Sequence, residues 1–266
     1  MLTDDFMQEI KKTIFAAAEA ASHITLDYFR KNSLGHSDKQ SHGRWDPVTI
    51  ADQEAEKAIR AQISKDFPEH NILGEEFGLL DQGSDFEWII DPIDGTRAFI
   101  TGLPVWGILI GVSYLKKPFF GVMMQPCTGE IFYGDGKSAF LRHNNQERQL
   151  SVRLEDDISK AHFLTTSPHI FENYNMNKAF NALKDACLHT RYGTDCYGYM
   201  SLAMGCSDIV CEVGLSPYDF MPLIPILRGA GASVANFSGG DDFSKGEIIA
   251  TGSEALQNQV ISFMQQ

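Results

Sequence analysis

The chain has 266 residues, of which 43% are hydrophobic and 18 are Phe, so it can bury a substantial core as one large unit or two subdomains. Asp and Glu outnumber Lys and Arg by 35 to 22, which gives a formal net charge of −13, and no cluster of basic residues stands out. Because nucleic acids are bound mainly through Lys and Arg, this balance argues against a nucleic-acid partner.

The cysteines and the beginning of the chain bear on its location. The five cysteines are odd in number and contain no C-x-x-C pair, which favours reduced thiols in a cytoplasmic protein. The opening MLTDDFMQEIKK is acidic where a signal peptide would be basic. No stretch approaches the roughly 20 apolar residues that a membrane span needs. We therefore expect a cytoplasmic protein with no membrane partner.

The first predicted elements are helices. Apolar residues recur at three-, four- and seven-residue steps and predict one long helix over residues 4 to 31. A polar, glycine-containing segment follows, and a second helical pattern over residues 51 to 67 stops at Pro68. The short apolar runs NILG and WII come next, and WII is typical of a buried strand.

A change of pattern divides the rest of the chain. Four β-rich segments separated by Gly, Pro and Lys turns indicate an antiparallel sheet: VWGILIGVSYL, PFFGVMMQP, EIFYG and AFLR. The hydrophilic connector RHNNQERQ, residues 142 to 149, is the expected boundary between subdomains 1–142 and 143–266. Beyond it, short strands alternate with helices expected near residues 173–186, 197–205 and 218–229 and from Ser253 onward. This alternation points to βαβ units.

Carboxylates follow several of these apolar runs. Glu75 and Glu76 follow NILG, Asp91 and Asp94 follow WII, and Asp219 begins the helix after SPY. Loops at the strand ends of an α/β protein converge on one site. Clustered carboxylates require a cation, and oxygen ligands without a His or Cys cluster favour Mg²⁺ over zinc. Each motif alone is more often a turn or a cap, so the prediction depends on the combination.

The stretch WIIDPIDGTRAFITG, residues 88 to 102, carries a further prediction. Pro92 is expected to end the strand, and Asp94 to act as the N-cap of a short helix. The free N–H groups of Gly95 and Thr96 would then form an anion site at the helix N-terminus. Cation ligands on one side and backbone donors on the other predict a phosphate site.

These motifs together resemble the inositol monophosphatase superfamily of Mg²⁺-dependent phosphatases. The resemblance rests on GEE, WIIDPIDGT, PYD with Glu212 seven residues before its Asp, and WDPVTIAD at residues 45 to 52, and it spans nearly the whole chain. It implies an α+β fold, a layered αβαβα sandwich, usually a homodimer. It also implies hydrolysis of a small-molecule phosphate monoester with two or three Mg²⁺ ions per subunit.

Carried over residue by residue, the resemblance implies a ligand set for the cations: Glu75, Asp91, the backbone carbonyl of Ile93, Asp94 and Asp219. The first ion would take Glu75, Asp91 and Ile93, and the second would take the three aspartates. Catalysis would rest on Glu75, Thr96 and Asp94, with Glu75 and Thr96 orienting the attacking water.

The resemblance also implies residues around the phosphate and the leaving group: Gly95, Thr96, Asp195, Glu212 and Asp219. Asp52 would support the waters of the metal site, and Glu76 would lie just behind the ligands. No covalent phosphoenzyme is implied, so no cysteine is needed as a nucleophile.

Departures from the commonest family pattern bear on the leaving group. Inositol-type members usually read D-G-T-T-N-F, whereas this chain reads DGTRAF, and its DCYGY and PYDFMPLIPI segments look like the histidinol-phosphate phosphatase branch. Histidinol phosphate carries an ammonium and an imidazole, which carboxylates recognise, whereas a polyol needs neutral partners. Asp195 indicates a cationic leaving group more sharply than Glu212 does, because inositol enzymes also have a Glu at the position of Glu212. Asp195 could equally be a turn residue or a helix N-cap.

The sequence therefore leaves three hypotheses for the function. The first is a phosphatase that acts on L-histidinol phosphate, and the second is a phosphatase that acts on inositol 1-phosphate or a similar polyol phosphate. The third is a regulatory protein on a phosphatase scaffold. Arg97 either contacts the substrate or pairs with a carboxylate across a subunit interface, and we favour pairing.

Other conspicuous residues are given lesser roles. His36 and His42 are not expected to bind metal. Lys39 could lie near the catalytic loop, and Trp106 and the Met123–Met124 pair are expected in the core.

Overall fold

The computed structural model describes residues 3–31, 36–38 and 47–265. Its helices are α1 (Asp4–Tyr28), α2 (Ile50–Asp66), α3 (Thr96–Ile100), α4 (Pro168–Glu172), α5 (Asn177–Ala186), α6 (Asp195–Ala203), α7 (Pro217–Phe220), α8 (Ile224–Gly229) and α9 (Glu254–Met264), with a 3-10 turn at Ile158–Lys160. Its strands are β1 (His36–Asp38), β2 (Pro47–Thr49), β3 (Asn71–Gly74), β4 (Gly78–Leu80), β5 (Phe86–Asp94), β6 (Gly107–Tyr114), β7 (Lys117–Gln125), β8 (Glu130–Gly134), β9 (Ala139–His143), β10 (Gln146–Gln149), β11 (His162–Thr165), β12 (His189–Tyr192), β13 (Ile209–Glu212), β14 (Ser233–Ala235) and β15 (Ile248–Thr251).

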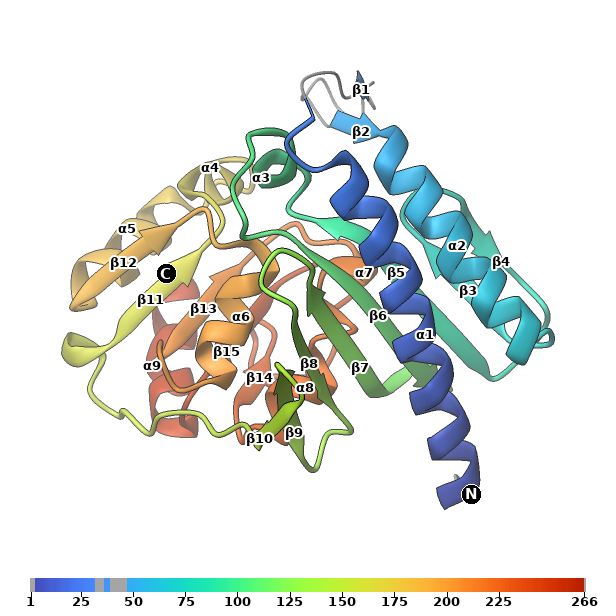
Figure 1. The fold of residues 1–266 in the computed structure, drawn as a ribbon. Helices are drawn as coiled ribbons and strands as arrows, with labels where there is room; N and C mark the ends of the chain where they lie inside the picture. The colour runs from blue at the N-terminus through green and yellow to red at the C-terminus, as the bar shows by residue number, and fades with distance from the viewer. Residues whose placement is uncertain (1–2, 32–35, 39–46, 266) are drawn as a thin grey trace.

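Two large sheets and three helical layers build the molecule (Figure 1). An eight-stranded sheet has the order β10-β9-β8-β7-β6-β5-β3-β4, and a five-stranded sheet has the order β12-β11-β13-β15-β14. α1 and α2 cover the outer face of the first sheet, α6 and α8 lie between the sheets, and α5 and α9 cover the second. The predicted αβαβα sandwich is confirmed.

The strand alternation of β5 decides which side chains enter the central layer. Trp88 and Ile90 pack into the core formed with α1 and α2. Because successive strand residues point to opposite faces, Ile89 and Asp91 project toward the layer that contains α7 and α8. Asp91 is therefore delivered to the interior between the sheets, where it is 2% exposed.

The long N-terminal helix ends earlier than predicted. α1 stops at Tyr28 and not at residue 31, because Arg30 adopts a left-handed conformation with a φ of 62°. The Arg30 guanidinium donates to the carbonyl of Gly102 through Nε at 3.1 Å and Nη2 at 3.0 Å. The chain therefore turns toward the loop that follows α3.

The predicted end of the strand at Pro92 is wrong. β5 continues to Asp94, and its register against β6 shifts between Asp91 and Asp94. A proline is tolerated at such an irregularity because its missing N–H removes no regular ladder bond. The predicted N-cap is also wrong, since Gly95, with a φ of 85°, holds that position of α3.

The hydrophilic connector is partly strand. Residues 146–149 form β10, which pairs with β9 as a hairpin at the edge of the first sheet, so the chain leaves this sheet after Gln149. The division at residues 142 and 143 into two subdomains remains a proposal. In the second half, β11 is parallel to β12 and β13, whereas β15 is antiparallel to β13, so the βαβ pattern holds for part of this sheet.

Two predicted helices of the second half have different bounds in the structure. The helix expected near residues 173–186 begins later, as α5 at Asn177, because Asn175 has a left-handed φ of 58°, and the separate helix α4 ends before that range, at Glu172. The helix expected at residues 218–229 is split into α7 and α8. Pro222 lies between these two helices, which fits the cost of a proline within a helix.

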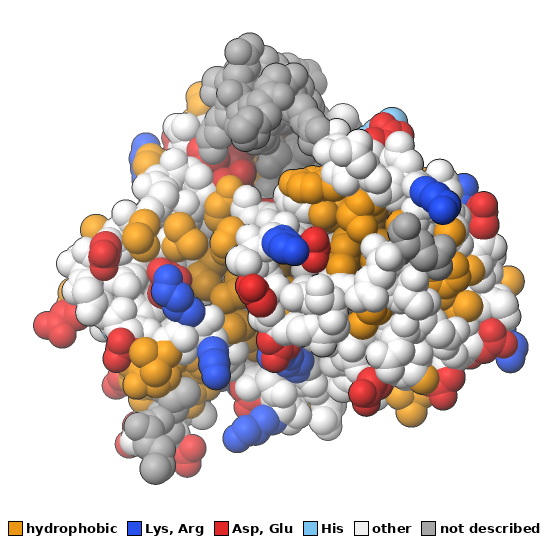
Figure 2. Space-filling view, turned by 180° about the vertical axis from the view of Figure 1, so that it is seen from behind, with side chains coloured by type: hydrophobic (Ala, Val, Ile, Leu, Met, Phe, Trp, Pro, Cys, Tyr) orange, Lys and Arg blue, Asp and Glu red, His pale blue; other side chains and the backbone are white. Residues whose placement is uncertain are grey.

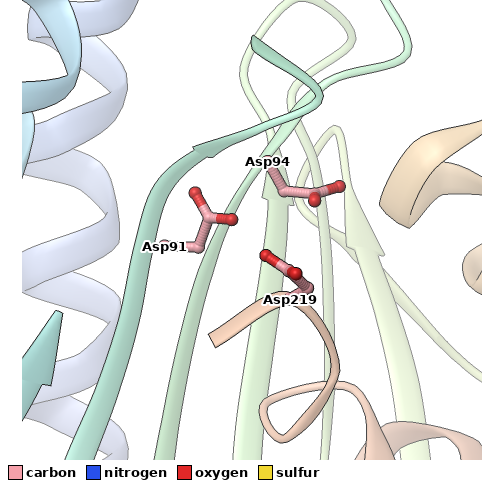
Figure 3. Close-up of side chains that lie close together, drawn as sticks. All are labelled: Asp91, Asp94 and Asp219. Carbon is pink, nitrogen blue, oxygen red and sulfur yellow. The ribbon is translucent and has the colours of Figure 1, made fainter. Parts of the chain in front are cut away.

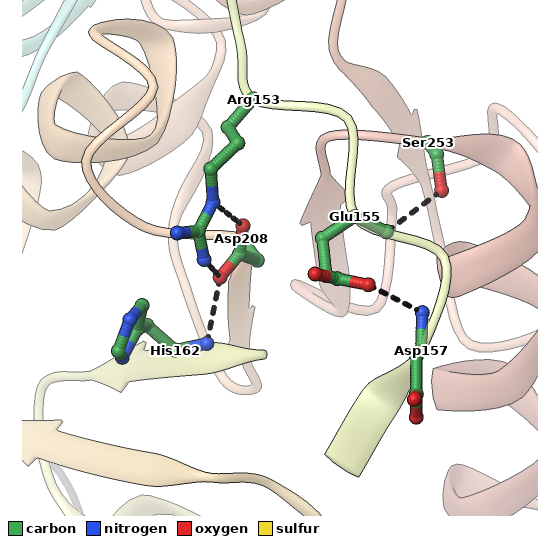
Figure 4. A network of polar contacts seen from close by, with 6 residues as sticks. All are labelled: Arg153, Glu155, Asp157, His162, Asp208 and Ser253. Atoms are coloured by element: carbon green, nitrogen blue, oxygen red, sulfur yellow. Dashed lines mark hydrogen bonds and ion pairs between the residues drawn. The ribbon is translucent and has the colours of Figure 1, made fainter. Parts of the chain in front are cut away.

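An ion pair anchors the segment after β10 (Figure 4). Arg153 Nε donates to Asp208 Oδ1 at 2.8 Å, and Asp208 Oδ2 accepts the backbone N–H of His162 at 2.7 Å. Ser253 Oγ donates to the carbonyl of Glu155 at 3.2 Å. The segment that connects the two sheets after β10 is therefore fixed against the start of β11 and the N-cap of α9.

The charged surface and the apolar character of the helices are as follows. On the face shown in Figure 2, Lys and Arg side chains are interspersed with Asp and Glu, without a continuous basic patch. Within the described ranges, no helix combines the length and the apolar character that crossing a membrane requires. All five cysteines are unpaired.

Candidate active site

Three aspartates from two elements meet between the sheets (Figure 3). Asp91 and Asp94 come from the end of β5, and Asp219 comes from α7. One carboxylate oxygen of each lies within 4.8 Å of the others. These residues were predicted to share one cation, and the fold brings them together.

The chain after Asp91 is held by its own side chains. Asp91 Oδ1 accepts the backbone N–H of Ile93 at 3.0 Å, and Thr96 Oγ1 donates to the carbonyl of Ile93 at 3.1 Å. The side chain of Ile93 is fully buried in the core under α1 and α2. The backbone of Ile93, whose carbonyl is a predicted ligand, is therefore held by Asp91 at its N–H and by the Thr96 hydroxyl at its carbonyl.

Asp219 is oriented by the start of its helix. Asp219 Oδ2 accepts the backbone N–H of Ser216 at 2.7 Å, and the N–H of Asp219 donates to the carbonyl of Ser216 at 3.0 Å. The bond from the Ser216 N–H to the Asp219 carboxylate is the part of a helix-capping box in which the third helical residue satisfies the N-cap amide. Asp219 Oδ2 thus holds the turn at Ser216, and the Asp219 carboxylate contributes an oxygen to the cluster with Asp91 and Asp94.

The electrostatics of the cluster call for positive charge. Burial raises the pKa of Asp91 well above its usual range, and the charges of Glu75, Asp94, Asp219 and Asp52 raise it further. Burial also raises the pKa of Asp94, while hydrogen bonds from Cys196 oppose the shift. Buried carboxylates at this spacing repel one another unless a cation compensates them. A divalent cation with oxygen ligands therefore fits the donor set.

Glu75, Glu76 and Asp52 lie around this centre. Glu75 is half-buried on the turn after β3, and its backbone N–H donates to the carbonyl of Ile90 at 3.2 Å. It is not one of the three residues that meet within 4.8 Å, but its charge acts on Asp91. Asp52 is 2% exposed in the first turn of α2. Glu76 follows Glu75 and donates its N–H toward α2.

Asp195 lies against the DGT turn. A Cβ on Gly95 would come within 3.2 Å of Asp195 Cβ, so only glycine fits there at its φ of 85°. Asp195 is the first residue of α6 and has a φ of 42°, whereas Thr194 holds the N-cap position. The alternative of Asp195 as an N-cap is therefore wrong.

The surroundings of Asp195 are acidic. Burial raises the pKa of Asp195 to about 8, the charges of Asp94 and Glu212 contribute, and Arg97 opposes them. Arg97 is an exposed residue of α3. A cationic group of a substrate would relieve the repulsion among these carboxylates.

Glu212 is more enclosed than predicted for a residue that binds substrate. Its carboxylate is 2% exposed, with Oε1 accepting the N–H of Thr166 at 2.6 Å and Oε2 accepting the hydroxyl of Tyr199 at 2.9 Å. Burial raises its pKa, and these hydrogen bonds oppose the shift. Glu212 thereby connects β13, the end of β11 and α6. Thr166 and Tyr199 carried no recognisable signal in the sequence.

The remaining predicted residues divide into two groups. Trp106 and Met123 are fully buried and Met124 is 9% exposed, so their assignment to the core is confirmed. His36 belongs to β1, whereas Lys39 and His42 lie outside the described residues.

A separate cavity of about 810 Å³ lies on the same sheet face, beside α7. Its apolar lining includes Leu73, Ile89 and Phe220. Its charged lining carries both signs, namely Glu87, Lys116, Lys117, Arg228, Asp241 and Asp242. This mixture does not select an anion, so the acidic cluster and the start of α6 are the better candidate for a phosphate site.

Comparison with known proteins identifies similar chains. A sequence model of the inositol monophosphatase family matches residues 7–266. The bifunctional phosphatase IMPL2 of Arabidopsis thaliana, named as chloroplastic, is 40% identical over 228 residues, which are 84% of this chain but 63% of that protein. The histidinol-phosphatase of Chlorobaculum parvum is 34% identical over 246 residues, 92% of each protein. The solved structure of an inositol monophosphatase from Zymomonas mobilis is 33% identical, has a TM-score of 0.83 and covers 96% of this chain and 98% of that one.

Proposed function

Since the chain belongs to the inositol monophosphatase family and is a phosphoric monoester hydrolase, we propose that it is a Mg²⁺-dependent phosphatase that prefers L-histidinol phosphate. The observation that supports this substrate is the position of Asp195, whose Cβ lies 3.2 Å from where a Cβ on Gly95 would be. A carboxylate beside the phosphate turn can pair with an ammonium on the leaving group. The similarity to the Chlorobaculum parvum histidinol-phosphatase, 34% identical, points the same way.

The cation ligands in this proposal are Asp91, Asp94, Asp219, Glu75 and the carbonyl of Ile93. Two or three Mg²⁺ ions would supply positive charge that offsets the carboxylates and the phosphate and polarises the attacking water. Asp52 and Glu76 would support the ligands from α2 and from the β3–β4 turn.

The rest of the chemistry is assigned to the chain. Glu75 and the Thr96 hydroxyl orient the attacking water, and the amides of Gly95 and Thr96 donate to phosphate oxygens, where charge accumulates in the transition state. Asp195 binds the ammonium of the leaving group. Glu212 adds negative charge behind Asp195 and holds α6 in place through Tyr199.

Phosphate release from two substrates tests the proposal. L-histidinol phosphate and myo-inositol 1-phosphate are compared in Mg²⁺ and in EDTA. We expect a higher kcat/KM for histidinol phosphate and no turnover in EDTA. Equal or faster turnover of the inositol phosphate would reject the substrate, and turnover in EDTA would reject the metal-dependent mechanism.

An inositol or similar polyol phosphate is the second candidate. It is supported by the solved inositol monophosphatase, which is 33% identical with a TM-score of 0.83. A purely regulatory role is less well supported, because the acidic cluster is intact. We further propose a cytoplasmic homodimer, which light scattering of the purified protein tests for the assembly.

A further inference from the structure

The turn that carries Glu75 is closed by a side chain from another element. Residues 75–77 connect β3 to β4, with Gly74 paired with Gly78 at the base of the hairpin. The backbone N–H of Glu76 donates to Glu56 Oε2 at 2.7 Å, and that of Phe77 donates to Glu56 Oε1 at 3.2 Å. One carboxylate of α2 therefore satisfies two successive amides of the turn.

Glu56 is itself held in place. Its side chain is fully buried, and Arg60 Nε, one helical turn later, donates to Glu56 Oε1 at 2.7 Å. The second donor group of Arg60, Nη2, bonds to the carbonyl of Gly78. The Glu56–Arg60 pair thus holds the turn and the first residue of β4 together. A buried charge with a complete set of partners holds a well-defined position.

The hairpin is shaped to admit this carboxylate. A Cβ on Gly74 would lie 2.1 Å from Glu56 Oε1, so a side chain at position 74 would displace Glu56. Asp52, Glu56 and Arg60 are spaced at i, i+4 and i+8, which places them on one face of α2. On this face, the charge of Asp52 raises the pKa of Asp91, and the carboxylate of Glu56 binds the turn that carries Glu75.

We propose that Glu56 is a positioning residue that fixes the Glu75 carboxylate for the cation. The inference rests on the proposed role of Glu75 as a ligand. Because the N–H groups of Glu76 and Phe77 are both bound to the Glu56 carboxylate, the direction of the preceding Glu75 side chain is set before a cation binds. Without Glu56, the turn amides must find other acceptors, and the carboxylate loses its fixed direction.

The test measures Mg²⁺ binding by calorimetry, without substrate. Glu56→Gln keeps the shape of the side chain but removes the charge and one of the two acceptors. We expect its Mg²⁺ dissociation constant to rise about 10- to 100-fold, the range typical of residues that orient metal ligands. Glu54→Gln, the same change at an exposed position of α2, is the matched control and should leave binding unchanged.

Thermal melting of the metal-free variants separates positioning from a structural role. A folded Glu56→Gln protein that binds Mg²⁺ as tightly as the parent, even with a lower melting temperature, would overturn the proposal. If Glu56→Gln does not fold, Glu56→Asp keeps the charge and withdraws the carboxylate by about one bond length, and the same loss of affinity is expected.

A third variant distinguishes this inference from the proposed function. Glu75→Gln should weaken Mg²⁺ binding at least as much as Glu56→Gln. A loss in Glu75→Gln alone rejects the role of Glu56 and leaves the proposed function standing. No loss in Glu75→Gln removes Glu75 from the ligand set, and the inference fails with it.

Discussion

Asp94 Oδ2 accepts a hydrogen bond from the backbone N–H of Cys196 at 2.7 Å, across 102 positions of the sequence. This bond joins the end of β5, which carries the cation ligands, to the first turn of α6, where Asp195 lies. The cation site and the proposed leaving-group site are therefore directly connected, and a substitution in one should alter the geometry of the other.

Neutralising Asp94 should abolish turnover without unfolding the protein. Asp94→Asn removes a carboxylate ligand from the cation site. Because a bound cation supplies several kcal/mol of transition-state charge stabilisation, we expect kcat to fall by more than about 100-fold. Because burial raises the pKa of Asp94, losing its charge also relieves a cost in the metal-free state. We expect the melting temperature in EDTA to be equal or higher. A large drop in that temperature would mean that Asp94 chiefly supports the fold.

Asp195→Asn should act on the leaving group selectively. A hydrogen bond to a charged group contributes about 1.5–3 kcal/mol, so kcat/KM for histidinol phosphate should fall about 10- to 100-fold. Turnover of an aryl phosphate, which lacks the ammonium, should change little. Asp185→Asn, on the exposed side of α5, is the control. An equal loss with both substrates would assign Asp195 a structural role.

The metal-free protein should lose stability as the pH rises. Burial raises the pKa of Asp195 to about 8, and it also raises the pKa values of Asp91 and Asp94. In the unfolded chain these carboxyls titrate near 4, so between about pH 4 and 8 the native state holds more protons. The free energy of unfolding therefore decreases with pH over this range.

Mg²⁺ should weaken this dependence, because the cation compensates the ionised carboxylates of Asp91 and Asp94. Melting temperatures measured in EDTA and in saturating Mg²⁺ across this pH range provide the comparison. Groups elsewhere in the chain contribute equally to both series. Parallel curves in the two series would show that the acidic cluster is not where Mg²⁺ binds.

Tyr199→Phe should destabilise the central layer. The Tyr199 hydroxyl donates to the buried Glu212 Oε2 at 2.9 Å, and its loss leaves a buried carboxylate oxygen without this donor. Such a loss costs about 1–3 kcal/mol of unfolding free energy, measurable by urea denaturation. Tyr114→Phe, at a ring that is 39% exposed, should have almost no effect. Similar stabilities for the two variants would contradict the assigned role of the Glu212 contacts.

Much of the site was predictable because its residues are local in sequence. Asp91 and Asp94 follow an apolar run that is typical of a buried strand, and strand ends are where such sites form. Asp219 was grouped with them because it follows SPY at the expected start of a helix, and the resemblance to a known family then assigned it to a cation. The predictions failed where local rules compete: Pro92 is compatible with a strand at a register shift, and β10 is an exposed edge strand whose polar residues read as a loop.

The contacts that hold the site could not be predicted. Glu56 lies 20 positions from the amide of Glu76, and Tyr199 lies 13 positions from Glu212. A buried carboxylate that binds a distant amide leaves no periodic pattern, because its partner is defined only by the fold. In the sequence, Glu56 looked like any acidic residue of a helix, although its side chain is fully buried.

A crystal structure with Mn²⁺ and phosphate would locate the cations directly through the anomalous signal of the metal. We expect anomalous peaks bounded by Asp91, Asp94, Asp219 and Glu75, with phosphate oxygens at the amides of Gly95 and Thr96. Metal bound elsewhere in an active crystal, with no peak between these carboxylates, would contradict this expectation.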